Sequence, residues 1–199
     1  MIPPAQDLAR KAPSREPRSF ILVLYERPVH EEYVQWVKQQ THHHPIALEP
    51  MPTDDPLKNI RFARERATIA REQGAAYDEV WCVFDRLPDG VAELVADSSE
   101  LSGVRLVDNS PNFELWLLLH FADLAPGTGP DVQLVKFLPG YQGALAGDES
   151  ALQGRYDHAR LRATALPPSH GHTNTFSLVD SVLQSYEDFK GDRPATVDL

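Results

Sequence analysis

The chain has 199 residues, of which 42% are hydrophobic and 24% charged, a composition that suits one globular domain with a small appendage and excludes a fusion of two enzymes. Its 19 basic and 29 acidic residues give a net charge of -10, which excludes a protein drawn to nucleic acid by its overall charge. Any contact with nucleic acid must therefore be local or bridged by a metal ion.

The first 18 residues carry four prolines and four basic residues, a composition that cannot bury enough apolar surface to offset ordering. We expect a flexible arm over residues 1–18, and it lacks the apolar core of a signal peptide. Phe20 to Tyr25 is a continuous apolar run, typical of a strand buried on both faces of a parallel sheet. Glu31 to Gln40 has apolar residues at helical spacing, acids in its first turn and Lys38 in its last, which predicts a helix.

The middle of the chain repeats the order of strand and helix. Ile46 to Pro50 predicts a short second strand. Asp55 as N-cap and Gly74 just past the end delimit a long helix over Leu57–Gln73. Tyr77 to Phe84 again has the pattern of a buried strand.

Shorter elements follow, with a helix over Val91–Asp97 and a strand over Val104–Val107. The helix predicted from Asn112 to Phe121 is apolar almost all round, so it must be buried. The single cysteine, Cys82, lies inside a predicted buried strand, which excludes a disulfide framework and a CxxC metal site and fits a reducing cytosol. Because the apolar runs are too short to span a bilayer, we expect a cytoplasmic protein with no membrane partner.

Strands that alternate with helices predict an α/β fold, with a mostly parallel sheet and helices on both faces. The core is expected over residues 19–125. From residue 126 the chain is richer in Gly, Pro and polar residues, and we expect a mainly helical extension over residues 126–199. Its helices are predicted near residues 132–137, 151–165 and 175–184.

Two acids follow buried strands directly, Glu26 after the first and Asp85 after the Tyr77–Phe84 strand. Ligands of open parallel sheets bind beyond the carboxyl ends of the strands, so both acids point to the functional edge if these strands are neighbours. Two such carboxylates suit Mg²⁺ or Mn²⁺. The alternative is that they are solvated turn residues or helix caps.

Three further acids are candidates for the same site. Glu31 and Glu32 either complete it or only interact with the dipole of the helix that they begin. Glu114 lies in an apolar helix start at a position that ordinary capping does not explain, so it needs a metal, an arginine or a polar cleft as partner. His120 lies about 240° further round that helix and cannot share a face with Glu114.

The Leu57–Gln73 helix is rich in basic residues, which form either a solvated face or a local contact for phosphate. No GxGxxG or GxxxxGK[ST] motif is present, which argues against a Rossmann cofactor site and a P-loop. The basic residues are Lys58, Arg61, Arg64, Arg66 and Arg71, against the acids Glu65 and Glu72.

Several blocks together resemble the RloB-like family, which belongs to the Toprim (topoisomerase-primase) class. They are Tyr25-Glu26 after the first strand, Glu31 five residues on, the block Val80 to Arg86, and the block Asn109 to Phe121 with its sequence Phe-Glu-Leu-Trp-Leu-Leu-Leu-His-Phe. The resemblance covers residues 19–185 and is weak in the last third.

The resemblance implies a Toprim-like core in which a glutamate after the first strand and a DxD pair after a later one hold Mg²⁺ for phosphodiester chemistry. It also implies a bacterial anti-phage or abortive-infection system with an ATPase as partner. Carried over by position, Glu26 is the first-strand acid, Glu31 the following acid, Asp85 the first Asp of the DxD pair and Glu114 the acid of the Phe-Glu-Leu-Trp block.

The chain departs from the family pattern at two positions. Arg27 stands where the family usually has Gly, and Leu87 replaces the second acid in Asp85-Arg86-Leu87. Leucine cannot ligate a metal, so Asp89 or Glu32 would have to replace it. Arg27 either pairs with Asp85 or contacts a phosphate.

Two functions remain open at this point. The first is a Mg²⁺- or Mn²⁺-dependent nuclease in which Glu26, Asp85 and Asp89 hold the metal and Glu31 or Glu114 orients water or metal. The second is a catalytically degenerate Toprim module that binds a partner protein or nucleic acid without cleaving it.

Overall fold

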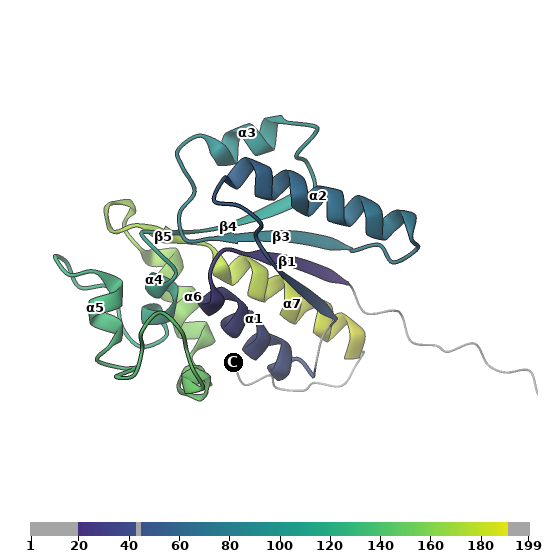
Figure 1. The fold of residues 1–199 in the computed structure, drawn as a ribbon. Coiled ribbons are helices and arrows are strands. Elements are labelled where there is room, and N and C mark those ends of the chain that lie inside the picture. Colours follow the sequence, from purple (N-terminus) through teal and green to yellow (C-terminus); the bar gives the residue numbers. More distant parts are fainter. Residues whose placement is uncertain (1–19, 43–44, 191–199) are drawn as a thin grey trace, which may run out of the picture.

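A computed structural model describes residues 20–42 and 45–190, so the arm expected over residues 1–18 lies outside the described part. The elements, labelled in Figure 1, are β1 Ile21–Tyr25, α1 Pro28–Gln40, β2 Ile46–Pro50, α2 Pro56–Glu72, β3 Glu79–Phe84, α3 Val91–Asp97, β4 Val104–Ser110, α4 Glu114–Leu119, α5 Pro130–Leu134, α6 Tyr156–Ala165, β5 His172–Thr173 and α7 Thr175–Lys190. Two 3-10 turns lie at Asp148–Leu152 and Pro168–His170.

The five strands form one sheet in the order β2-β1-β3-β4-β5. The first four are parallel, and the short β5 pairs antiparallel with β4. This confirms the predicted α/β fold with a mostly parallel sheet. β1 and β3 are central neighbours with Tyr25 opposite Val83, so the residues that follow these strands emerge side by side at the carboxyl edge.

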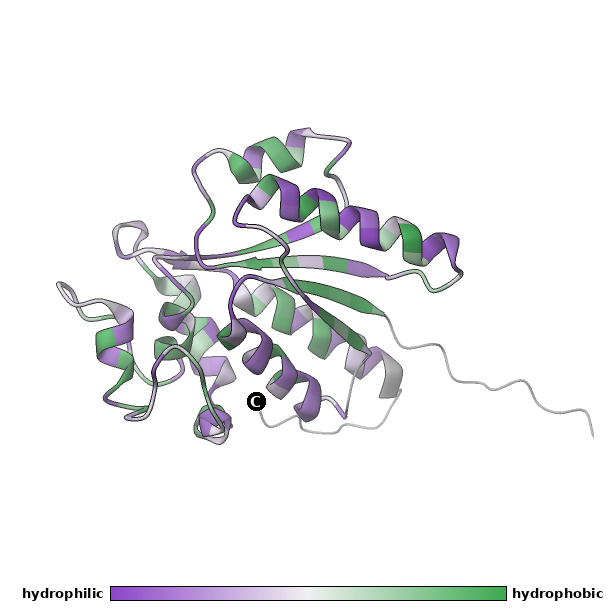
Figure 2. Cartoon of the chain, viewed as in Figure 1, coloured by the Kyte–Doolittle hydropathy of each residue, from purple (hydrophilic) through white to green (hydrophobic). Residues whose placement is uncertain are grey.

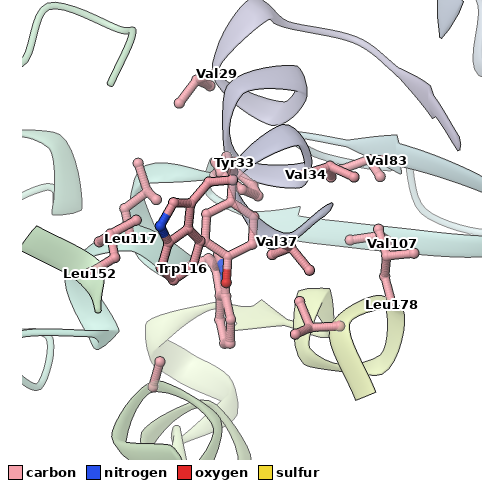
Figure 3. Packing of buried hydrophobic residues seen from close by; sticks show 14 of the residues in the cluster. Val29, Tyr33, Val34, Val37, Val83, Val107, Trp116, Leu117, Leu152 and Leu178 are labelled. Carbon is pink, nitrogen blue, oxygen red and sulfur yellow. The ribbon is translucent and has the colours of Figure 1, made fainter. Parts of the chain in front are cut away.

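Helices cover both faces of the sheet (Figure 1). α2 and α3 lie over one face, where a smaller core forms around Leu22, Leu24 and Ile60. α1 and α7 lie over the other face above a larger core, in which the rings of Tyr33 and Trp116 pack against each other (Figure 3). Within the described ranges, no helix has the length and apolar character needed to cross a membrane.

Hydropathy follows these layers: the central strands are hydrophobic along most of their length, and the outer sides of the helices are hydrophilic (Figure 2). β1 is buried along most of its length, which explains why its sequence is one continuous apolar run. α2 begins where its capping residues predict, since the Asp55 carboxylate accepts hydrogen bonds from the backbone N–H groups of Leu57 and Lys58.

Several predicted boundaries were wrong. α1 begins at Pro28 rather than Glu31, because Arg27 adopts the extended backbone of an N-cap and Pro28 fits the first helical position. The predicted helix 151–165 is split into a 3-10 turn and α6, and the helix near residues 132–137 is the earlier α5. Segment 126–199 also supplies β5 to the sheet and α7 to its covering layer.

His120, at the end of α4, is 1% exposed and lies among the rings of Tyr33 and Trp116. Its Nδ1–H donates to the Trp116 carbonyl at 3.0 Å. Burial lowers the pKa of His120 from 6.5 to about 4. The unfolded chain therefore binds a proton at this histidine at a higher pH than the folded chain does.

We expect the free energy of unfolding to fall by about 3 kcal/mol between pH 7 and pH 4, through His120. Urea unfolding at several pH values measures this slope. His120→Gln should flatten it more than the control His158→Gln, which replaces an exposed histidine. An unchanged slope in His120→Gln would show that other groups cause the loss.

Candidate functional site

Acids from three strands gather at the carboxyl edge of the sheet. Glu26 follows β1 and Asp85 follows β3, and the Asp85 backbone N–H donates to Glu26 Oε2 at 2.8 Å. Asp108, near the end of β4, accepts the backbone N–H of Leu87 at 2.8 Å. The parallel strands thus place the three carboxylates at the edge where α/β sheets bind ligands.

Arg27 bridges two acids that lie 58 and 87 residues away in the sequence. Its Nη1 lies 2.5 Å from Asp85 Oδ2, and its Nη2 lies 2.6 Å from Glu114 Oε1. Nη1 also donates to Glu114 Oε2 at 3.1 Å, so the Glu114 carboxylate is held by both arms of the guanidinium fork. Arg27 is therefore the partner that Glu114 needs inside its apolar surroundings.

The carboxylate oxygens of Asp85 and Glu114 also accept hydrogen bonds from other groups. Asp85 Oδ1 lies 3.0 Å from His30 Nε2 and accepts the backbone N–H of Phe113 at 3.0 Å. Glu114 Oε1 accepts the hydroxyl of Tyr141 at 2.8 Å. His30 is fully buried, and its Nδ1 faces the backbone N–H of Arg27, which fixes Nε2–H as the donor to Asp85. We call Arg27, Asp85, Glu114, His30 and Tyr141 the Arg27 cluster.

The cluster is ionised at neutral pH. Burial raises the pKa of Asp85, but hydrogen bonds from His30 and Arg27 outweigh burial and bring it to about 2. Burial likewise opposes ionisation of Glu114, yet hydrogen bonds from Arg27 and Tyr141 lower its pKa below the ordinary value. The hydrogen bond to Glu114 raises the pKa of Arg27. Two carboxylates and one guanidinium therefore carry full charges.

The other acids predicted for the site have other surroundings. Burial and the neighbouring Glu31 raise the pKa of Tyr25 to about 12, and Glu32 accepts the backbone N–H of Leu145. Asp89 is exposed in the turn before α3. In the described part of the chain, none of these three acids hydrogen-bonds Asp85 or Glu114. Glu26, Asp85 and Glu114 are the predicted site residues that the fold brings together.

Leu87, at the position of the second acid in the DxD pair, does not face the Arg27 cluster. It is 6% exposed and packs into the smaller core with Phe84, Val95 and Leu101. Asp85 instead points to the opposite side of the sheet edge, toward His30 and Phe113. The side chain at position 87 therefore packs in the core beneath α3.

Besides His30, sequence reasoning missed three polar residues at this edge. Asp108 directly follows the strand predicted to end at Val107, so the rule that found Glu26 and Asp85 would also have found it. His172, on β5, pairs with Asp108 Oδ2 at 2.7 Å. Tyr141 comes from an irregular segment after α5, and no local pattern marks it.

A family model described as RloB-like protein matches residues 21–185. The chain belongs to the RloB-like family. No match was found among curated proteins or among solved structures.

The donor set of this RloB-like chain does not fit Mg²⁺ or Mn²⁺. Both oxygens of Asp85 and both oxygens of Glu114 already accept hydrogen bonds from the cluster. In the described ranges, no group of three or more His, Cys, Asp or Glu side chains is placed to hold a metal ion. Arg27 supplies the positive charge that two buried acids at this edge require.

Proposed function

We propose that this RloB-like chain is a Toprim-type component of a bacterial anti-phage or abortive-infection system that acts with an ATPase partner and does not itself cleave phosphodiesters. The single observation that carries the non-cleaving role is the position of Arg27 between Asp85 and Glu114. The Toprim class, the defence role and the ATPase partner rest on the sequence resemblance.

The charges of the site support a binding role. Cleavage of a phosphodiester needs positive charge aimed at the phosphate, from a metal ion or a free cationic side chain. Here the charge of Arg27 is offset by Asp85 and Glu114, and Glu26 adds a further carboxylate at the same edge. The charge of Arg27 is therefore not free to meet the developing charge of a phosphate.

A second candidate is a Mg²⁺- or Mn²⁺-dependent nuclease, favoured by the convergence of Glu26, Asp85 and Asp108 on one sheet edge. For this function Arg27 would have to leave Asp85. The two candidates are distinguished by whether cleavage occurs and whether it depends on a divalent ion.

The full chain, with and without the proposed ATPase partner, should be incubated with end-labelled RNA and DNA in Mg²⁺, Mn²⁺ or EDTA. We expect the two proteins to co-purify and no cleavage in any condition. Mg²⁺- or Mn²⁺-dependent cleavage that is lost in Asp85→Asn would overturn the non-cleaving role. Failure of the two proteins to associate, with and without ATP, would remove the ATPase from the proposal.

A further inference from the structure

Three arginines of α2 lie on one face of the helix and lack a carboxylate partner. Arg61, Arg64 and Arg71, together with Thr68, are spaced three or four residues apart, which places them in one row along the helix. Among the described residues, no carboxylate oxygen lies within 4 Å of these three guanidinium groups. We call Arg61, Arg64, Thr68 and Arg71 the α2 row.

Unpaired arginines are unexpected in a chain with a net charge of -10. Arg66, on the opposite side of the same helix, is held by both oxygens of Glu49. Across the described ranges, the arginines that pair with a carboxylate are Arg27, Arg66, Arg105, Arg160 and Arg162. Acids are abundant, so three adjacent guanidinium groups without a carboxylate form a local surface available to an anion.

The part of the α2 row from Arg64 to Arg71 borders a pocket. Its volume is about 190 Å³, and its polar lining comprises Arg64, Thr68, Arg71, Tyr77, Ser102 and one acid, Asp78, whose Oδ2 accepts the backbone N–H of Phe20 at 2.7 Å. Arg64 Nη1 donates to the Ser99 carbonyl, which holds this guanidinium against the loop before β4. Hydroxyl groups and guanidinium groups on one surface are the donors that contact phosphates in nucleic-acid complexes.

The α2 row is separate from the Arg27 cluster. α2 lies on the face of the sheet opposite α1, and its outer side is largely hydrophilic (Figures 1 and 2). The pocket lies at the starts of β3 and β4, whereas Asp85 and Asp108 lie at their other ends. A ligand on the α2 row therefore does not depend on the chemistry of the cluster.

We propose that the α2 row binds the phosphate backbone of a nucleic acid. Arg61 and Arg71 are ten residues apart, about 15 Å along the helix axis, which corresponds to about four phosphate-to-phosphate steps along one strand of a duplex. The row presents no pattern for reading bases, so binding is independent of sequence. The exposed Glu65 and Glu72 on the same helix weaken the positive potential of the α2 row. Because salt screens the remaining attraction, affinity is strongest at low salt.

Binding is measured by fluorescence anisotropy with labelled single-stranded RNA, single-stranded DNA and duplex DNA. The salt concentration is varied from about 25 to about 200 mM. Arg61→Gln/Arg71→Gln should weaken binding by about tenfold or more at low salt and lower the slope of log affinity against log salt by about 2. The control, Lys136→Gln/Arg155→Gln, makes the same change in net charge at exposed residues outside α2 and should have little effect.

The three probes show whether the bound backbone is RNA, DNA or both. Equal losses in the two double variants would show that only net charge matters and would overturn the proposal. Absence of binding by the wild type to every probe at low salt would also overturn it, and would leave a protein partner as the ligand of this face. Neither result bears on whether the Arg27 cluster cleaves phosphodiesters.

Discussion

Replacing Arg27 with methionine should lower the free energy of unfolding at pH 7 by about 2 to 4 kcal/mol. The substitution keeps much of the aliphatic stem but leaves Asp85 and Glu114 without their cation. The Glu114 side chain is 5% exposed and that of Asp85 is 21% exposed, so water compensates for little of the lost interaction. Urea unfolding followed by circular dichroism measures the difference.

The loss in Arg27→Met should shrink as the pH falls toward 3. Without the guanidinium, the Asp85 and Glu114 carboxyl groups bind protons at a higher pH, and neutral carboxyl groups no longer need a cation. Arg66→Met is the matched control, since Arg66 pairs with Glu49 nearer the surface and should cost about 1 kcal/mol or less. If Arg27→Met cost no more than Arg66→Met, the cluster would not depend on its arginine.

Leu87→Asp should destabilise the chain by about 3 kcal/mol or more, because it places a carboxylate in the core between the sheet, α2 and α3. Leu87→Asn is the matched control, because asparagine has nearly the same shape as aspartate but carries no charge. Thermal unfolding is measured for both variants with and without about 10 mM Mg²⁺, a concentration high enough to detect weak binding.

Because the side chain at position 87 faces away from Asp85, Mg²⁺ should stabilise Leu87→Asp no more than Leu87→Asn. A larger rise in unfolding temperature for Leu87→Asp would mean that the new carboxylate reaches a metal. Such a rise would restore position 87 as part of a half-formed metal site and favour the nuclease.

The parts of the fold that could be predicted are those determined by nearby residues. Continuous apolar runs identified β1 and β3, because strands buried on both faces need apolar residues at every position. Asp55 and Gly74 marked the ends of α2 through capping geometry that spans a few residues. The gathering of Glu26 and Asp85 at one edge followed from the parallel sheet.

The parts that could not be predicted depend on contacts distant in sequence. The pairing of Arg27 with Asp85 was one of two alternatives, and its second contact, with Glu114, required the start of α4 to lie beside Asp85. His30 was overlooked because the helix was expected to begin after it. Tyr141 reaches Glu114 from an irregular segment whose path is set by packing of the C-terminal third.

We propose that Arg27 supplies the positive charge that Asp85 and Glu114 need at this sheet edge. Calorimetric titration of Mn²⁺ into the wild type, Asp85→Asn and Arg27→Gly tests it most directly, with circular dichroism to verify that each variant is folded. We predict no Mn²⁺ binding to the wild type or to Asp85→Asn below about 1 mM, and new binding in Arg27→Gly, where Asp85 and Glu114 lose their cation. Tight Mn²⁺ binding by the wild type that Asp85→Asn abolishes would contradict the claim.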